Sequence, residues 1–431
     1  MLVYLPGLNK MKTLFYPPRL NSLLVRFLQK IAPCVLRWFY QLELVVSSES
    51  LDKIKSLESS NLLLTPNHPT FQDPMVIFAL SAKLDKQFYY LGAYELFQGL
   101  LAWFLPLIGV YSLRRGLADR PSLKETLAIL SNPQCSLVVF PEGGCSFQND
   151  TVMPFRAGCL QMAFQALNQT FKQRKPLPDL YVVPVSIKYK YTQNMTSAIA
   201  KTLKKLEQAL KFNPPANSTP YQRLRLIAEQ IMGRIEQDYG LVSSETQNKP
   251  LSRTERIERL RIKILENCEQ QLGFKTNPQQ MVRERTYKLE NFLKTQVEQW
   301  ELNSVDSESD VLFNQLPINL QLMEKSVKRL LNFDAIYDGY VAENPTPERF
   351  LDTLIRLERE VFGIDQPPPK GFRQAFVKIG TPVNLKDIFL DYQRTQDETG
   401  VTSRNERMEQ VMLEIQQEVQ KNLDQLNQKI N

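Results

Sequence analysis

The sequence is poor in the side chains that bind metal ions. Its 431 residues contain one histidine, His68, and five cysteines without any C-x-x-C pair. The cysteines are Cys34, Cys135, Cys145, Cys159 and Cys268. A structural zinc site needs about four closely spaced cysteine or histidine ligands, so the usual zinc modules are excluded and no metal site is predicted. An odd number of scattered cysteines also argues against a disulfide framework and favours a reducing compartment.

The sequence also lacks a hydrophobic run that is clearly long enough to cross a bilayer. The longest uncharged stretch, residues 96–113, contains Pro106. A spanning helix needs about 20 mostly apolar residues, and an internal proline interrupts a helix. We therefore expect this stretch to be buried core or to lie at an interface. No small-residue cleavage site of a secretory signal follows an apolar segment near the N-terminus.

The excess of positive charge is small. Lys and Arg number 53 against 46 Asp and Glu, which gives a net charge of +7. Such an excess favours an anionic membrane face or a phosphorylated ligand as a partner. It is too small to predict binding to nucleic acid.

A basic amphipathic helix is expected within residues 1–45. On a helix, Arg26, Lys30 and Arg37 fall within about 40° of one another. The opposite side is apolar and aromatic, with Leu24, Leu28, Ile31, Val35, Trp38 and Phe39. Cations beside aromatic side chains are typical of a segment that lies in a membrane surface, which predicts a peripheral or monotopic protein on the cytoplasmic side of a membrane. The alternative is a helix packed on the protein's own core, and Pro33 predicts a kink or two short helices.

The middle of the chain alternates between short apolar runs and helical patterns. Strands are expected at residues 61–65, 87–91, 109–113, 136–140 and 180–188, and helices at 74–83, 121–130 and 155–171. Such alternation predicts an α/β fold with helices against a sheet.

The chain then becomes charged and helical before a strand pattern returns at residues 375–380. A capping box at Ser252 and Glu255 starts one helix, residues 277–302 form another, and residues 304–310 are an acidic linker. The predicted organisation is a membrane-associating segment, an α/β domain, a helical insert, a returning strand and a C-terminal helix, at residues 1–45, 46–195, 196–371, 372–395 and 396–431.

The C-terminal segment carries an apolar seam for a partner helix. Its members are residues 408, 412, 415, 419, 423, 426 and 430. A spacing of three and four residues suits helix pairing. We expect the seam to pack against the helical insert of the same chain, with dimerisation as the alternative.

The candidate catalytic pair lies in residues 65–74, TPNHPTFQDP. Pro69 and Pro74 disfavour helical backbone at the residues before them, so His68 and Asp73 sit in a turn that can fold the carboxylate onto the imidazole. A histidine held by a carboxylate is a better base and can take a proton from an alcohol. Local spacing leaves two ordinary roles open: Asp73 as a helix N-cap before proline, and His68 as a loop residue.

These residues resemble the glycerolipid acyltransferases, a family that includes the lysophosphatidic acid and glycerol-3-phosphate acyltransferases. Asn67, His68 and Asp73 stand in the register of the family's N-H-x₄-D. Further blocks follow in the family's order: GVYSLRR at 109–115, FPEGGCS at 140–146, PFRAG at 154–158, VPV at 183–185 and VKIGTP at 377–382. The resemblance covers about residues 60–190 and the returning strand. It implies a mixed sheet flanked by helices, of the acyltransferase type.

The resemblance also implies roles for the site residues. His68 removes a proton from an acceptor hydroxyl, Asp73 orients His68, and the alkoxide attacks a thioester without a covalent enzyme intermediate. The backbone N–H groups near Gly143 or Gly144 are candidates to stabilise the oxyanion.

Three arginine side chains are candidates to bind the phosphate of the acceptor. Arg115 is the first candidate because a guanidinium binds phosphate bidentately, and Arg114 and Arg156 can add charge. Glu142 is expected to bind the acceptor or to brace the site. The sequence departs from the family at Gly144 and Cys145, where threonine and arginine are usual, which removes one cation.

The leading function is therefore transfer of an acyl group from acyl-carrier protein or acyl-coenzyme A to a lysophospholipid, 1-acylglycerol-3-phosphate, in phospholipid biosynthesis. A thioester supplies the driving force, so no metal or nucleotide cofactor is required. Glycerol-3-phosphate is a second possible acceptor, and residues 96–113 line an acyl-chain tunnel or form plain core. Two different functions stay open: a hydrolase with Cys145 as nucleophile, and a non-catalytic membrane interaction protein. The chain contains no G-x-S-x-G motif, which argues against a serine hydrolase.

Overall fold

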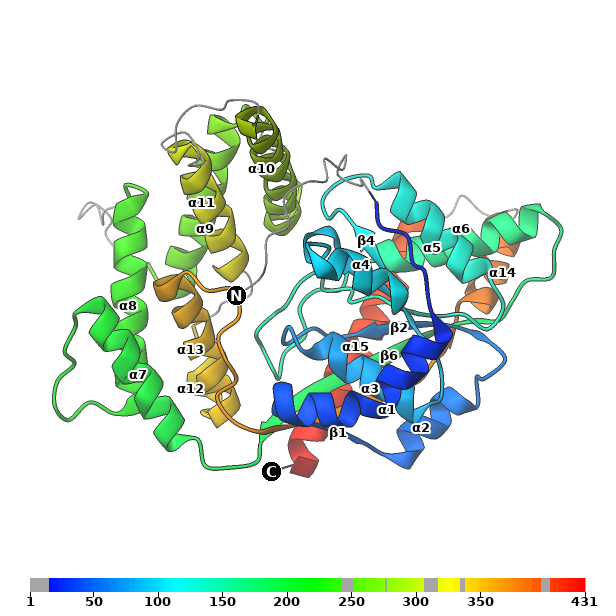
Figure 1. Cartoon of the computed structure of the whole chain (residues 1–431), viewed down its shortest axis with the longest axis horizontal. Helices are drawn as coiled ribbons and strands as arrows, with labels where there is room; N and C mark the ends of the chain where they lie inside the picture. The colour runs from blue at the N-terminus through cyan, green and yellow to red at the C-terminus, as the bar shows by residue number, and fades with distance from the viewer. Residues whose placement is uncertain are drawn as a thin grey trace.

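A mixed sheet of eight strands forms the centre of the α/β domain, at the right of Figure 1. The computed structural model describes residues 15–241, 251–275, 277–305, 317–333, 338–396 and 404–430. The strands are β1 Leu42–Val46, β2 Asn61–Pro66, β3 Tyr89–Ala93, β4 Val110–Leu113, β5 Ser136–Val138, β6 Leu180–Tyr191, β7 Arg373–Ile379 and β8 Val383–Asn384. Their order is β1-β7-β6-β2-β5-β3-β4, with β8 also beside β6. β7 and β8 run antiparallel to β6, and the other neighbours are parallel.

Helices cover both faces of the sheet. One layer contains α1 Ser22–Phe39, α2 Ser48–Lys55 and α3 Asp73–Lys83, and the other contains α5 Arg120–Ser131, α6 Gly158–Lys172, α14 Leu385–Gln396 and α15 Arg404–Ile430. Successive side chains of a strand point to opposite faces, so Leu62 and Leu64 of β2 pack in the first layer and Leu63 packs in the second. Because both of its faces are buried, β2 is an apolar run rather than an alternating strand.

The returning strand is an internal member of the sheet. β7 lies between β1 and β6, with Ala375 opposite Leu44 on one side and Tyr189 on the other. The chain therefore leaves the sheet after β6 and returns to it at β7, as predicted. It also begins at Leu42, earlier than the expected boundary at residue 46, because β1 pairs with a strand that is about 330 residues away in sequence.

The helical insert, residues 196–371, lies at the left of Figure 1 and has its own apolar core. All its described elements are helices: α7 Thr196–Leu210, α8 Pro220–Asp238, α9 Arg253–Gln271, α10 Val282–Val305, α11 Ile318–Phe333, α12 Tyr340–Glu343 and α13 Pro347–Phe362. Ser252 and Glu255 form the expected capping box at the start of α9. Of the predicted acidic linker, residues 304–305 end α10 and the remainder lies outside the described residues.

The C-terminal helix does not pack as expected. Met412, Ile415 and Val419 of α15 are fully or almost fully buried, and the helix lies against β6, β7 and α6 rather than against the insert. The apolar seam is thus used inside the α/β domain. A period of three to four residues fits a sheet surface as well as a partner helix, so the sequence pattern could not separate the two.

The N-terminal basic helix is a single helix, α1, that contains Pro33. Its buried side chains are Val25, Gln29, Ala32 and Leu36, a face rotated by about 100° from the most apolar side of the helix. Trp38 and Phe39 are each 78% exposed. Among the described residues, no helix is both long enough and apolar enough to span a bilayer.

The apolar stretch at residues 96–113 is neither a span nor simple core. It contains the end of a one-turn 3₁₀ helix at Tyr94–Leu96, the short helix α4 Leu100–Leu107, and β4. Leu100 and Trp103 of α4 are 76% and 67% exposed. The backbone N–H of Arg19 donates to the carbonyl of Pro106, which places the end of α4 beside the start of α1.

Candidate active site

His68 and Asp73 are in direct contact. The Nδ1 atom of His68 lies 2.6 Å from Oδ2 of Asp73. The imidazole follows the end of β2, and Asp73 is the first residue of α3, so strand, turn and helix together hold the pair. The Asp73 side chain is fully buried, whereas 14% of the His68 side chain is exposed. A buried carboxylate against Nδ1 leaves Nε2 of the ring to face a reacting group.

Asp73 is held by four donors, and it is not a helix cap. Oδ2 also accepts from the backbone N–H of Thr70 at 2.9 Å, and Oδ1 accepts from the hydroxyl groups of Thr70 and Tyr189. The N-cap position of α3 is Gln72, whose side chain makes no capping bond. The carboxylate is therefore aimed at the imidazole, and the N-cap alternative is wrong.

The pKa of His68 is raised well above its ordinary value. Burial acts in the opposite direction, but the charge of Cys145 and the hydrogen bond to Asp73 outweigh it. Negative groups within hydrogen-bond reach favour the imidazolium.

Asn67 and Glu142 brace the backbone around His68. The side-chain amide of Asn67 donates to the carbonyl of Ile187 at 3.0 Å and accepts from its N–H at 2.7 Å, which joins the end of β2 to β6. Oε1 of Glu142 accepts the backbone N–H of His68 at 3.0 Å. Both side chains are fully buried, and Glu142 ties the glycine loop to the backbone of His68.

Glu142 provides a prediction about pH. Burial raises its pKa to about 7, above the value in an unfolded chain, so the folded protein retains this proton to higher pH. The associated stability is present below the unfolded pKa and is lost as the pH rises through about 7. Between pH 5 and 8, Glu142→Gln should therefore gain about 1–3 kcal/mol in the free energy of unfolding relative to the wild type. Urea unfolding at each pH measures this difference, and a parallel pH dependence of both proteins would contradict it.

The predicted phosphate-binding arginine is already paired. One terminal nitrogen of Arg115, Nη2, lies 3.2 Å from Glu95 and 3.6 Å from Glu290, and the other, Nη1, donates to the hydroxyl of Tyr287 at 3.1 Å. These partners raise the pKa of Arg115 against the effect of burial. A phosphate at Arg115 would have to displace the two carboxylates.

The other predicted cations stack on aromatic rings. The guanidinium of Arg114 lies 4.8 Å from the ring centre of Tyr94, and that of Arg156 lies 5.5 Å from the ring centre of Tyr287. Arg156 also lies against Gly143, which places it beside the site. The structure therefore brings Arg115 and Arg156 together at Tyr287, and Arg114 extends to a different ring.

The glycine loop, residues 140–146, starts just beyond β5 and adjoins His68. The N–H of Gly143 donates to the carbonyl of Phe140 at 3.0 Å, which closes a turn that Gly143 enters with a φ of +74°. Its N–H is thus used within the turn, and the N–H of Gly144 stays the other candidate oxyanion donor. The N–H of Ser146 donates to the carbonyl of His68 at 2.8 Å.

Side chains of the helical insert donate hydrogen bonds to this loop. The sequence did not predict these contacts. From α10, Arg283 donates to the carbonyl of Glu142 at 2.6 Å and Tyr287 donates to the carbonyl of Gly143 at 2.6 Å. From α13, Arg356 donates to the carbonyl of Ser146. These residues lie in ordinary helical patterns of the sequence, and no motif marks them.

The approach of α10 leaves little room for a side chain at Gly144. A Cβ atom at this position would lie 2.6 Å from the Tyr287 hydroxyl and 3.2 Å from Arg283. Atoms that are this close must move apart. The threonine that is usual in the resembled family would have to displace the side chains of Tyr287 and Arg283.

Gly144→Ala should therefore lower the free energy of unfolding by about 1–3 kcal/mol. In a Tyr287→Phe background, which removes the close hydroxyl, the same change should have a smaller effect. A double-mutant cycle by urea unfolding measures the coupling. Gly158→Ala is the matched control, because a Cβ atom there meets nothing within 4 Å. Equal effects of Gly144→Ala in both backgrounds would contradict the contact.

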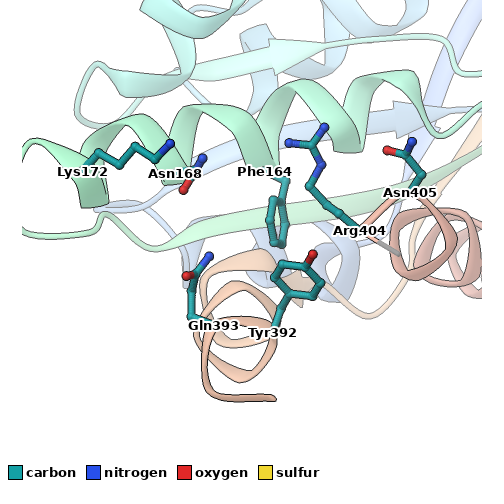
Figure 2. A pocket seen from close by; sticks show the side chains of 7 residues that line it. All are labelled: Phe164, Asn168, Lys172, Tyr392, Gln393, Arg404 and Asn405. Carbon is teal, nitrogen blue, oxygen red and sulfur yellow. The ribbon is translucent and has the colours of Figure 1, made fainter. Parts of the chain in front are cut away.

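A separate pocket lies away from these residues, among α6, α14 and α15 (Figure 2). Phe164, Tyr392 and Arg404 are among the side chains that line it. None of the predicted site residues lines this pocket. Within the described part of the chain, no three histidine, cysteine, aspartate or glutamate side chains group in a way that suits a metal ion.

Comparison with known proteins assigns the central segment to a type of domain. A search of curated proteins finds no match. A family model does match: residues 45–188, which include His68, Asp73 and the glycine loop, match the model described as Acyltransferase. The matched segment spans β1 to β6 of the sheet, about a third of the chain. Residues 45–188 are therefore an acyltransferase-type domain, and they support acyl transfer as the general reaction of this protein.

Proposed function

We propose that this protein transfers an acyl group from a thioester to the hydroxyl of a lysophospholipid, 1-acylglycerol-3-phosphate, in phospholipid biosynthesis. The observation that carries the proposal is the 2.6 Å contact between Nδ1 of His68 and Asp73. A carboxylate that is buried and held by four donors fixes the ring so that Nε2 can accept the acceptor's proton. The donor is a thioester of acyl-carrier protein or coenzyme A.

The second part of the proposal is attachment to a membrane surface on the cytoplasmic side. The exposed large apolar side chains of α1 and of the segment around α4 support it: Leu23, Phe27, Trp38, Phe39, Leu96, Leu100, Leu101 and Trp103. Arg26, Lys30 and Arg37 are exposed on the same helix α1. Exposed aromatic and basic side chains together favour an anionic lipid interface. Such an interface would bring an acceptor lipid close to the domain.

Product identification by mass spectrometry tests the proposed reaction. The purified protein in detergent is given acyl-coenzyme A or acyl-carrier protein with lysophosphatidic acid and with glycerol-3-phosphate, side by side. We expect phosphatidic acid from the lysophosphatidic acid reaction. Product from glycerol-3-phosphate alone would move the assignment to the other acceptor, and no product from any glycerol-based acceptor would refute the proposal.

Co-sedimentation with vesicles tests the membrane surface. We expect the protein to bind vesicles that contain anionic phospholipid, and Trp38→Ser with Trp103→Ser to lower binding at least several-fold. Leu413→Ser is the matched control, because Leu413 is 51% exposed on α15. Equal loss of binding in the control, or unchanged binding in the double variant, would contradict this surface.

A further inference from the structure

The proposed acceptor carries a phosphate close to its reacting hydroxyl. In 1-acylglycerol-3-phosphate the two groups are on adjacent carbons, so a bound acceptor places its phosphate close to the imidazole of His68. A phosphate that leaves water needs a cation or other donors to pair with it. The predicted cation, Arg115, is already paired with Glu95 and Glu290. The phosphate therefore needs a different cation beside the site.

Position 145 does not supply that cation. The Sγ atom of Cys145 lies 3.4 Å from Nε2 and 3.9 Å from Nδ1 of His68, so the sulfur lies against the face of the ring. The resembled family usually has an arginine at this position, whereas a thiol is short and carries no positive charge. A cation near this face of the imidazole has to come from another part of the chain.

The helical insert brings Arg359 of α13 to this place. The guanidinium carbon of Arg359 lies 4.6 Å from the ring centre of Phe147 and 5.5 Å from that of Phe71. The centres of these two rings are 5.3 Å apart. Phe71 belongs to the turn of the candidate catalytic pair, and Phe147 directly follows the glycine loop. Arg359 also interacts electrostatically with Cys145, so its charge lies beside both loops of the site.

One edge of the Arg359 guanidinium has no partner among the described residues. Its Nη1 atom donates to Oδ1 of Asn332 at 3.0 Å. Within the described part of the chain, Nε and Nη2 donate no hydrogen bond, and no carboxylate forms an ion pair with Arg359. Nε and Nη2 together make the edge of a guanidinium that can hold two oxygens of a phosphate side by side.

Neighbouring arginines of the insert differ in this respect. Arg329 lies 2.8 Å from Glu360, and this carboxylate raises its pKa against the effect of burial. Arg356 donates to the carbonyl of Ser146. The pKa of Arg359, in contrast, is lowered, because burial outweighs the attraction of more distant negative groups. A partly buried cation without a carboxylate partner is unfavourable, and an anion at its open edge would relieve this cost.

We propose that Arg359 binds the phosphate of the acceptor through Nε and Nη2. The proposal rests on the proposed function and adds to it the residue that recognises the acceptor. Stacking on Phe71 and Phe147 fixes the guanidinium before the acceptor arrives, so little side-chain freedom is lost on binding. The insert, which lies outside the matched domain, thereby determines which acceptor the domain takes.

Calorimetric titration with hexanoyl-lysophosphatidic acid, without any donor, tests the phosphate site. We expect Arg359→Gln to raise the Kd about 10- to 100-fold, the usual effect of losing charge-assisted hydrogen bonds. Arg359→Lys should lie between this variant and the wild type, because lysine keeps the charge and loses the fork. Arg253→Gln is the matched control, because Arg253 of the same insert pairs with Glu229, and its Kd should stay at the wild-type value.

Initial rates distinguish the phosphate of the acceptor from the phosphates of coenzyme A. In Arg359→Gln we expect the KM for lysophosphatidic acid to rise by the same factor as the Kd, and the KM for palmitoyl-coenzyme A to stay unchanged. A rise for the donor alone would overturn the assignment to the acceptor. Thermal unfolding without ligand shows which variants fold, and Arg359→Lys provides the test if Arg359→Gln does not.

The two measurements separate this site from the proposed function. Acyl transfer by folded Arg359→Gln with a wild-type Kd and KM for the acceptor would overturn the phosphate site and leave the proposed function intact. Weaker acceptor binding by the variant, in a protein whose wild type forms no ester, would support the phosphate site and refute the proposed function.

Discussion

His68→Ala is expected to lower the rate of acyl transfer by about 10²- to 10⁴-fold, the usual contribution of a positioned general base. The physical reason is that no other group can replace it. The chain contains one histidine, and the carboxylate of Asp73 is fully buried with its oxygens already engaged.

Initial rates with lysophosphatidic acid and acyl-coenzyme A measure this loss. Asn168→Ala is the control, because Asn168 lines the remote pocket of Figure 2, and its rate should stay at the wild-type level. The thermal unfolding midpoints of both variants show whether the fold is kept. A folded His68→Ala protein that retains more than a tenth of the activity would refute the role of the imidazole.

Asp73→Asn is expected to have the second largest effect, again about 10²- to 10⁴-fold in rate. The side chain keeps its shape, but the negative charge that stabilises the imidazolium is lost. Asp73 is among the groups that raise the pKa of His68, so the variant should also show a lower pKa for this ring. A purely structural role of Asp73 would reduce stability without moving that pKa.

Because the chain contains one histidine, the pKa of the His68 ring can be measured directly. Histidine-selective ¹⁵N labelling gives signals from one ring, and their titration reports both the tautomer and the pKa of His68. Asp179→Asn is the matched control, because Asp179 pairs with Lys386 away from the site. A ring pKa that is the same in Asp73→Asn and in the wild type would show that the carboxylate does not act through the imidazole.

Local patterns predicted most of the α/β domain because its elements carry local signals. Pro74 marks the start of α3, and the buried apolar runs mark β2, β5 and β6. The elements that local patterns do not predict have weak signals. β1 is five residues long and pairs with β7, and α4 is short and half exposed. The apolar seam of α15 predicts that this face of the helix is buried. It does not predict which element packs on the face, because the spacing of apolar residues carries no information about the partner.

Some features of the candidate site could likewise be predicted from local sequence, and others depend on the tertiary structure. The turn between β2 and α3 holds His68 and Asp73 five positions apart, so two prolines were enough to predict that they could meet. The glycine loop was found through its resemblance to a family motif. Its contact with His68 depends on the parallel pairing of β2 with β5, which brings the carboxyl ends of both strands to one edge of the sheet.

The sequence by itself determined the α/β class, the pair of imidazole and carboxylate, and the place where the sheet is interrupted, since each of these rests on residues that are close in the chain. Tertiary structure alone decided that Cys145 lies against the imidazole of His68, that Arg115 is paired with two carboxylates, and that Tyr287 of the insert leaves little room at position 144. The reason is that these contacts join segments between about 20 and 175 residues apart, and only the packing of the insert and the order of the strands bring them together.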